Sequence, residues 1–109
     1  MVTVRAPLRV DLTGGWTDLV PFTNDFGGEV VNFTINKYVT AHSDDAGEVS
    51  FIFDVPAGSG LGTSGALNVA KIAALQGIES MPLEELAEAA YQAETAAGNR
   101  CGRQDQWAA

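Results

Sequence analysis

The residues with the clearest chemical potential form a run of glycines and hydroxyl side chains near the middle of the chain. Glycines let a backbone turn tightly with its N–H groups facing one way, and the first turn of a following helix adds unpaired N–H donors and the positive end of the helix dipole. Because an alanine-rich stretch typical of a helix follows the run, the pattern predicts a binding site for a phosphate-like anion. The residues expected to form this glycine loop are Gly58, Ser59, Gly60, Leu61, Gly62, Thr63 and Ser64.

Three other interpretations of the glycine loop are to be weighed. A Walker-type loop would close on Gly-Lys-Ser or Gly-Lys-Thr, whereas residues 62–64 are Gly-Thr-Ser, which argues against a P-loop nucleoside triphosphatase. Residues 60–65 fit the three-glycine pattern of dinucleotide sites, but the expected acid after a second strand is replaced by Glu79, Glu84 and Glu85 around the start of a helix. The third interpretation is a glycine-rich turn that binds no ligand.

A carboxylate at the end of an apolar helical stripe is the second informative feature. A helix is predicted from about Pro82 to before Gly98, and its apolar positions, continued by the i, i+3, i+4 rule, reach Glu94. Burying an ionised acid is unfavourable unless a cation or strong donors meet it. Glu94 could therefore bind a metal ion together with the hydroxyl of Ser64. The alternative is that this helix end emerges into water and Glu94 is merely solvated.

Asp105 is a candidate general base, because an ionised carboxylate near a substrate hydroxyl can accept its proton. A lone acid in a loop is also a common helix cap, and that alternative remains open. If both acids serve one bound anion, the carboxylates of Glu94 and Asp105 must converge at the amino end of the helix that follows the glycine loop.

Composition limits the class of protein. The chain has 109 residues, 46% hydrophobic and 18% charged, which predicts one domain with its own core. No apolar run approaches the ~18 residues of a membrane span. The first residues show no apolar signal region, and a single cysteine favours a reducing compartment, so the cytoplasm is expected. A net charge of -8 argues against nucleic acid as a partner. An anionic substrate would need help from a metal ion or from the arginines Arg5, Arg9, Arg100 and Arg103.

The pattern along the chain predicts strands followed by helices. Alternation predicts short strands at 2–4 and 8–12, interrupted at Pro7, then strands at 30–39 and 49–55. A helix over 64–76 is apolar around most of its circumference, which predicts deep burial. Three or four strands should therefore precede the first helix.

Taken together, these segments resemble the GHMP kinases, the family named for galactokinase, homoserine kinase, mevalonate kinase and phosphomevalonate kinase. Residues 56–64 resemble the second motif of that family, and the spacing to Glu94 and Asp105 fits. Residues 5–18 resemble the first motif as found in heptose-phosphate kinases and the kinase domain of fucokinases, and 27–32 and 102–109 strengthen the match. The resemblance covers nearly the whole chain.

The resemblance implies an α+β fold like domain 2 of ribosomal protein S5, with helices packed on one face of a mixed sheet. It implies ATP-dependent transfer of a phosphoryl group to a sugar or sugar-phosphate hydroxyl. In that scheme the backbone of the glycine loop wraps the ATP phosphates, and Ser64 and Glu94 hold Mg²⁺. Asp105 is the base and Arg9 stabilises charge at the reacting hydroxyl. The sugar side is formed by Asp18, with Thr17 and Gly15 beside it.

The chain also departs from the family pattern. Family members are much longer and have a second, C-terminal domain, so residues 1–109 are expected to form one partial N-terminal domain. The segment 40–55 is shorter than in the family, and too few residues follow Asp105 to hold a helix by themselves. The alternative function is therefore a non-catalytic nucleotide-binding or interaction module. A dinucleotide oxidoreductase is a third and weaker option.

Overall fold

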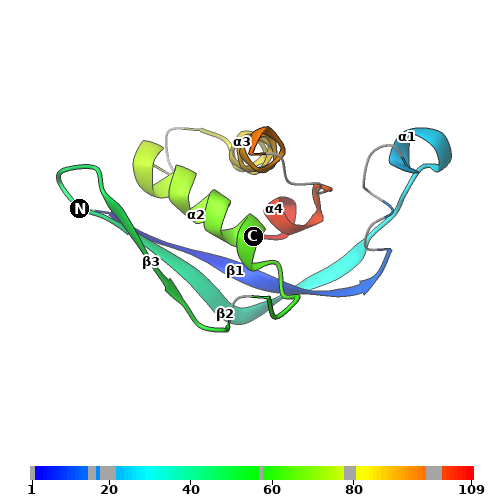
Figure 1. Cartoon of the computed structure of the whole chain (residues 1–109), viewed down its shortest axis with the longest axis horizontal. Helices are drawn as coiled ribbons and strands as arrows, with labels where there is room; N and C mark the ends of the chain where they lie inside the picture. The colour runs from blue at the N-terminus through cyan, green and yellow to red at the C-terminus, as the bar shows by residue number, and fades with distance from the viewer. Residues whose placement is uncertain (1, 15–16, 18–21, 57, 78–80, 98–101) are drawn as a thin grey trace.

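The computed structural model describes residues 2–14, 17, 22–56, 58–77, 81–97 and 102–109. In these residues, strands come first and the longer helices follow, as Figure 1 shows. The predicted α+β class is confirmed. The elements are β1 (Val2–Thr13), α1 (Phe22–Phe26), β2 (Val31–Ser43), β3 (Val49–Phe53), α2 (Thr63–Gln76), α3 (Leu83–Ala96) and α4 (Gln104–Ala108).

The three described strands form one sheet in the order β1-β2-β3, and both pairings are antiparallel. The expected mixed sheet is therefore not found in the described residues. The physical reason is the connections: a tight turn closed on Asp44 joins β2 to β3, and a parallel pair would need a crossover instead. An antiparallel sheet also does not match the parallel sheet of dinucleotide-binding folds, which removes support from the oxidoreductase option.

β1 continues through Pro7, where two separate strands had been predicted. Pro7 pairs with Tyr38 and Arg9 with Thr34, so the register shifts between these two positions in the manner of a β-bulge. The edge position of β1 tolerates the missing N–H of proline. The extra residues of this irregularity lie on β2, which runs from Tyr38 to Thr34 while β1 runs from Pro7 to Arg9. Leu8 is in the core under the helices, and the long side chain of Arg9 reaches Asp105 of α4.

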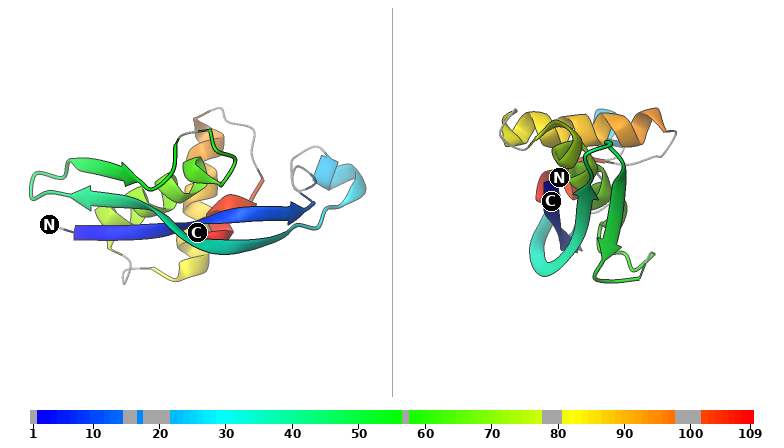
Figure 2. Two further views of the ribbon diagram at one scale, coloured as in Figure 1. Left: turned by 90° about the horizontal axis from the view of Figure 1, so that it is seen from below. Right: turned by 90° about the vertical axis from the view of Figure 1, so that its left-hand side faces the viewer.

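Both longer helices, α2 and α3, lie over one face of the sheet, and no described helix covers the opposite face (Figure 2). α2 packs directly on β1 and β2, and α3 crosses α2 on its outer side. The buried side of α2 consists of small residues, which let its backbone approach its neighbours closely: Gly65, Ala66, Val69, Ala70, Ala73 and Ala74. The predicted burial around most of the circumference holds for this stripe and in part for Leu67 and Ile72, whereas Leu75 is exposed.

Two short helices differ from the sequence expectations. α1 lies in a segment expected to be a loop, at the far end of the β1–β2 ribbon beyond the other helices (Figure 1). α4 forms from only five residues, although so few cannot hold a helix alone. It forms because α2, α3 and both long strands pack around it. In the described part of the chain, no helix has the length and apolar character that would let it cross a membrane.

Candidate functional site

The glycine loop leaves the amino end of α2 open to a ligand. Gly60 and Gly62 have φ values of 78° and 77°, in the left-handed region that glycine adopts without steric cost. Gly62 is the N-cap of α2, and it supplies no side-chain cap to the first-turn N–H groups. These donors, with the positive end of the helix dipole, are the features that favour an anion.

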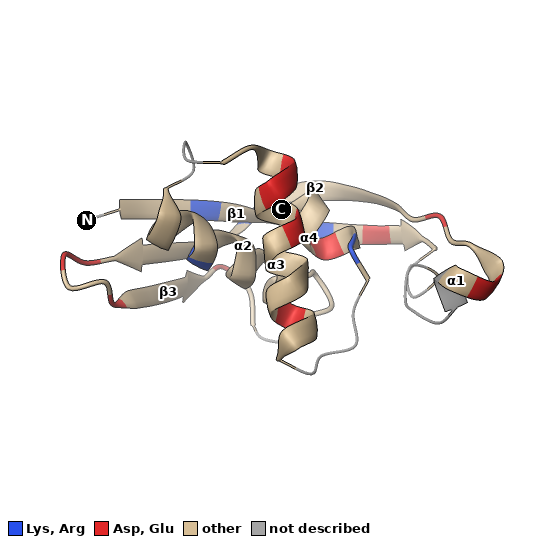
Figure 3. Cartoon of the chain, turned by 90° about the horizontal axis from the view of Figure 1, so that it is seen from above, with Lys and Arg blue, Asp and Glu red and all other residues tan. Residues whose placement is uncertain are grey.

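Arg9 joins the glycine loop to α4. Its Nε donates to Oδ1 of Asp105 at 2.7 Å, and its Nη1 donates to the carbonyl oxygen of Gly60 at 2.7 Å. The backbone N–H of Arg9 also donates to the carbonyl of Leu61 at 3.0 Å. The arginine side chain is 11% exposed and that of Asp105 28% exposed, so the ion pair is partly shielded from water. Basic and acidic positions meet where α4 lies against β1 (Figure 3).

Two glycines make room for Asp105. A Cβ atom at Gly65 would lie 2.5 Å from Cβ of Asp105 and 3.2 Å from the backbone nitrogen of Gln106. A Cβ atom at Gly62 would lie 3.4 Å from Oδ1 of Asp105 and 3.2 Å from Cγ of Arg9. Contacts below 3.0 Å are not accommodated without movement, so α4 can reach the start of α2 only because residue 65 is glycine.

Glu94 lies in the next layer of the site. It is on α3 and only 4% exposed, as its predicted place on the inward stripe requires. The hydroxyl of Ser64 donates to Oε1 of Glu94, Nδ2 of Asn68 donates to the same oxygen at 3.2 Å, and Nε2 of Gln106 donates to Oε2 at 3.0 Å. Helices α2, α3 and α4 therefore meet at one carboxylate.

The residues present are suited to Mg²⁺. Ser64 and Glu94 offer oxygen atoms, which are the ligands this ion prefers, and Mg²⁺ in phosphate-binding sites commonly uses one or two carboxylates with the remaining positions filled by phosphate and water. Among the described residues, no group of three His, Cys, Asp or Glu side chains forms a complete metal site. A cation here would thus depend on a bound phosphate as well as on the protein.

Two further contacts fix α4 at its start. Arg103 donates to both carboxylate oxygens of Glu88 on α3 and lies over the ring of Tyr91, 4.2 Å from its centroid. The hydrogen bond from Arg103 lowers the pKa of Glu88 below its ordinary value of 4.5, and the same bond raises the pKa of Arg103. Gln104 accepts a hydrogen bond from Asn32 of β2 at 3.3 Å. These contacts hold the two residues that precede Asp105.

The predicted sugar-side residues are described only in part. Gly15 and Asp18 lie outside the described residues. The hydroxyl of Thr17 donates to the carbonyl oxygens of Gly14 and Glu29, within the connection between β1 and β2. These two hydrogen bonds of Thr17 stabilise the connection between the strands.

Sequence reasoning missed two members of the site. Asn68 follows Ser64 by one helical turn, so its place on the same face of α2 could have been read from spacing. Gln106 gave no such signal, since its side chain reaches Glu94 through tertiary packing. The predicted residues Arg9, Ser64, Glu94 and Asp105 do come together with the glycine loop, while their chemical roles remain predictions.

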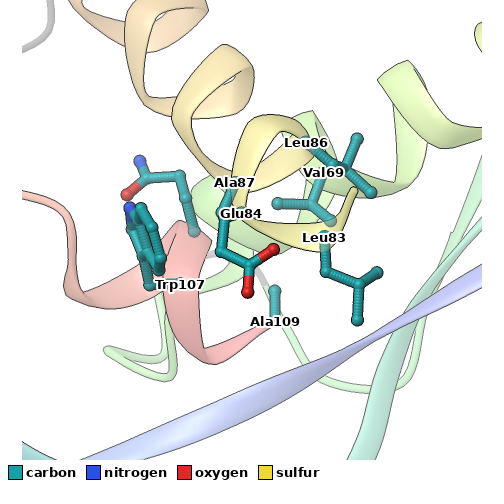
Figure 4. A pocket seen from close by; sticks show the side chains of 8 residues that line it. Val69, Leu83, Glu84, Leu86, Ala87, Trp107 and Ala109 are labelled. Atoms are coloured by element: carbon teal, nitrogen blue, oxygen red, sulfur yellow. The ribbon is translucent and has the colours of Figure 1, made fainter. Parts of the chain in front are cut away.

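An apolar pocket of about 220 Å³ lies between the start of α3 and the carboxyl end of α4 (Figure 4). It is separate from the glycine loop, none of whose residues line it. Its lining consists of Val69, Leu83, Glu84, Leu86, Ala87, Gln106, Trp107 and Ala109.

Comparisons with known proteins give one family. The sequence profile of the GHMP kinases N terminal domain matches residues 29–109. An L-fucokinase/L-fucose-1-P guanylyltransferase of Bacteroides fragilis is 52% identical over 31 residues, which are 28% of this chain and 3% of that protein.

Two solved structures have a similar fold. A D-glycero-D-manno-heptose 1-phosphate kinase from Bacteroides thetaiotaomicron superposes with a TM-score of 0.78 at 25% identity, over 100% of this chain and 53% of that chain. A Campylobacter jejuni protein described as a sugar kinase superposes with a TM-score of 0.69 at 24% identity, over 98% and 49%. The chain spans about half the length of these two structures.

Proposed function

Because the chain belongs to the GHMP kinase family, we propose that it serves ATP-dependent phosphoryl transfer to a hydroxyl group of a sugar or sugar phosphate. The observation that carries this proposal is the contact of Arg9 with both Asp105 and the Gly60 carbonyl, which holds a candidate base beside an anion-binding loop. The relatives named above favour a heptose phosphate or a fucose-like sugar as the acceptor.

The phosphates of ATP would bind at residues 58–64. The open N–H groups at the start of α2 and the helix dipole favour negative charge there without a lysine. Phosphoryl transfer depends mainly on positioning and on neutralising the oxygens of the transferred group. The loop would therefore contribute by positioning the phosphates and neutralising their charge, which requires no reactive side chain.

Asp105 would accept the proton of the attacking hydroxyl, and Arg9 would stabilise the charge that develops beside it. A general base contributes ~100- to 10,000-fold in typical cases. The ion pair with Arg9 fixes the orientation of Asp105, and Gly65 leaves room for that side chain next to the loop. The sugar itself would be held by Asp18, with Thr17 and Gly15 contributing.

Ser64 and Glu94 would hold Mg²⁺ in contact with the bound nucleotide. The ion, when bound, neutralises phosphate charge. Before the ion binds, Glu94 is a buried acid whose described hydrogen-bond donors are neutral side chains. The acid is thus oriented before the nucleotide arrives.

A second candidate is a nucleotide-binding module without catalysis. It is favoured by the share of the relatives that the chain covers, about half of either solved structure. Both functions would bind MgATP, and only the first would transfer a phosphoryl group. We place either activity in the cytoplasm, because a single cysteine fits a reducing compartment. The net charge of -8 disfavours nucleic acid as a partner.

The test is a transfer assay on the 109-residue chain with hexoses, fucose and heptose phosphates as acceptors. Acceptor-dependent ADP formation would support the kinase, and we expect Asp105→Asn to lower turnover by ~100-fold or more while MgATP affinity is kept. Asp45→Asn, in the exposed turn between β2 and β3, is the matched control. MgATP binding without any transfer would support the second candidate, and no MgATP binding by the wild-type chain would contradict both.

A further inference from the structure

The carboxylate of Glu94 is held from both sides by amide groups. Asn68 of α2 donates from Nδ2 to Oε1 at 3.2 Å, and Gln106 of α4 donates from Nε2 to Oε2 at 3.0 Å. Asn68 Nδ2 also donates to the carbonyl of Ser64 at 3.1 Å, which fixes the amide itself. Since the terminal torsion of a glutamate is otherwise broad, donors on both oxygens define the plane of the carboxylate.

Burial makes these contacts more than surface hydrogen bonds. Glu94 is 4% and Gln106 1% exposed. The donors described for Glu94 are neutral side chains, so these contacts orient the carboxyl group without bringing a cation to it. A buried acid whose oxygens are held in a defined orientation is the arrangement expected where a cation is to bind.

We propose that Asn68 and Gln106 are positioning residues that hold Glu94 in the orientation in which it binds the divalent cation of the proposed kinase site. The inference rests on that proposed function. Neither amide touches the cation in this scheme, and both act through Glu94. Gln106 also follows Asp105 directly in α4, so its hydrogen bond fixes the distance between the candidate base and the metal-binding acid.

The experiment is a Mg²⁺ titration of ATP binding by calorimetry, with metal-free ATP binding in EDTA measured alongside. Gln106→Met keeps the side-chain length and removes the donor, and Asn68→Ala removes the donor to Oε1. We expect the half-saturating Mg²⁺ concentration to rise about 10- to 100-fold in Gln106→Met, the usual effect of losing an outer-shell partner of a metal ligand. A smaller rise is expected in Asn68→Ala, because Ser64 still donates to Oε1.

Metal-free ATP binding should stay at the wild-type level in both variants. Gln76→Met and Asn36→Ala, at exposed positions of α2 and β2, are the matched controls and should change neither quantity. Equal losses with and without Mg²⁺ would indicate general damage to the fold and overturn the positioning role. So would a wild-type Mg²⁺ dependence in folded Gln106→Met.

If circular dichroism shows that Gln106→Met does not fold, Asn68→Ala decides: an unchanged Mg²⁺ dependence rejects the proposal, and a raised requirement supports it. Failure of the proposed function looks different. In that case the wild-type chain itself shows no Mg²⁺-dependent ATP binding.

Discussion

Nε of Arg9 and Oδ1 of Asp105 lie 2.7 Å apart, although these residues belong to the first strand and the last helix of the chain. The pair closes the fold at the amino end of α2. It does so with a side chain that a regular strand would direct to the opposite face of the sheet from Leu8. The same contact therefore holds α4 against β1 and orients the candidate base, Asp105.

The first prediction concerns this pair. Arg9→Met removes hydrogen bonds to a carboxylate and to the Gly60 carbonyl, and we expect the free energy of unfolding to fall by about 1.5–3 kcal/mol. Urea unfolding followed by circular dichroism measures it. Arg5→Met is the matched control on the same strand, where the exposed guanidinium lies over the ring of Tyr38, and it should lose no more than about 1 kcal/mol. Equal losses in both variants would contradict the special role of the Arg9 contacts.

The second prediction concerns Gly65. Alanine normally stabilises a helix interior relative to glycine by ~0.5–1 kcal/mol. Here the added Cβ would lie 2.5 Å from Cβ of Asp105, so we expect Gly65→Ala to destabilise instead, by about 1–3 kcal/mol. Thermal unfolding gives the sign, and Leu75→Ala, at an exposed position of the same helix, serves as a control. A raised melting temperature would show that α4 does not pack on α2 in this way.

The third prediction separates stability from ligand binding at Glu94. Glu94→Gln turns one acceptor oxygen into a donor amide nitrogen that faces the donors of Ser64, Asn68 or Gln106, so metal-free stability should fall by about 1–3 kcal/mol. Mg²⁺-dependent ATP binding should weaken, because an amide oxygen is a poorer ligand for Mg²⁺ than a carboxylate.

Glu85→Gln is the control for Glu94→Gln on the same helix. It removes an exposed acid from the first turn of α3, where the dipole favours one, so stability should fall by ~0.3–1 kcal/mol without an effect on Mg²⁺. Melting curves and Mg²⁺ titrations read out the two properties separately. A Mg²⁺ dependence retained in full by Glu94→Gln would remove Glu94 from the metal site.

The fourth prediction is a pH dependence. Arg103 holds the pKa of Glu88 below its ordinary value of 4.5 in the folded protein. Between these two pKa values, the unfolded chain therefore binds more protons than the folded protein. The stabilising contribution is present above pH 4.5 and is lost as the pH falls through the folded pKa. Arg103→Met should raise the pKa of Glu88 toward 4.5, which an NMR titration of its side-chain carboxyl carbon measures.

Lys71→Met is the control for Arg103→Met, because it removes a positive charge from the exposed side of α2. It should leave the pKa of Glu88 where it is in the wild type. The difference in unfolding free energy between the wild type and Arg103→Met should also shrink as the pH falls through the folded pKa of Glu88. A Glu88 pKa that does not move in Arg103→Met would show that the ion pair is not formed in solution.

The sequence by itself determined the local features. The two long helices, most of the strand segments, the glycine loop before α2 and the inward position of Glu94 follow from periodicity and turn chemistry, which act between residues close in the chain. The resemblance in the motifs supplied the family, which the comparison of residues 29–109 confirms.

Only the tertiary structure decided how distant residues meet. The irregular register near Pro7 depends on the pairing of β1 with β2, and the hydrogen bond from Arg9 to Asp105 depends on the packing of α4. α4 is a helix only because surrounding elements pack against its five residues, and that packing brings Gln106 to Glu94. The physical reason is the same in each case: these contacts join residues far apart in the chain, so no local pattern encodes them.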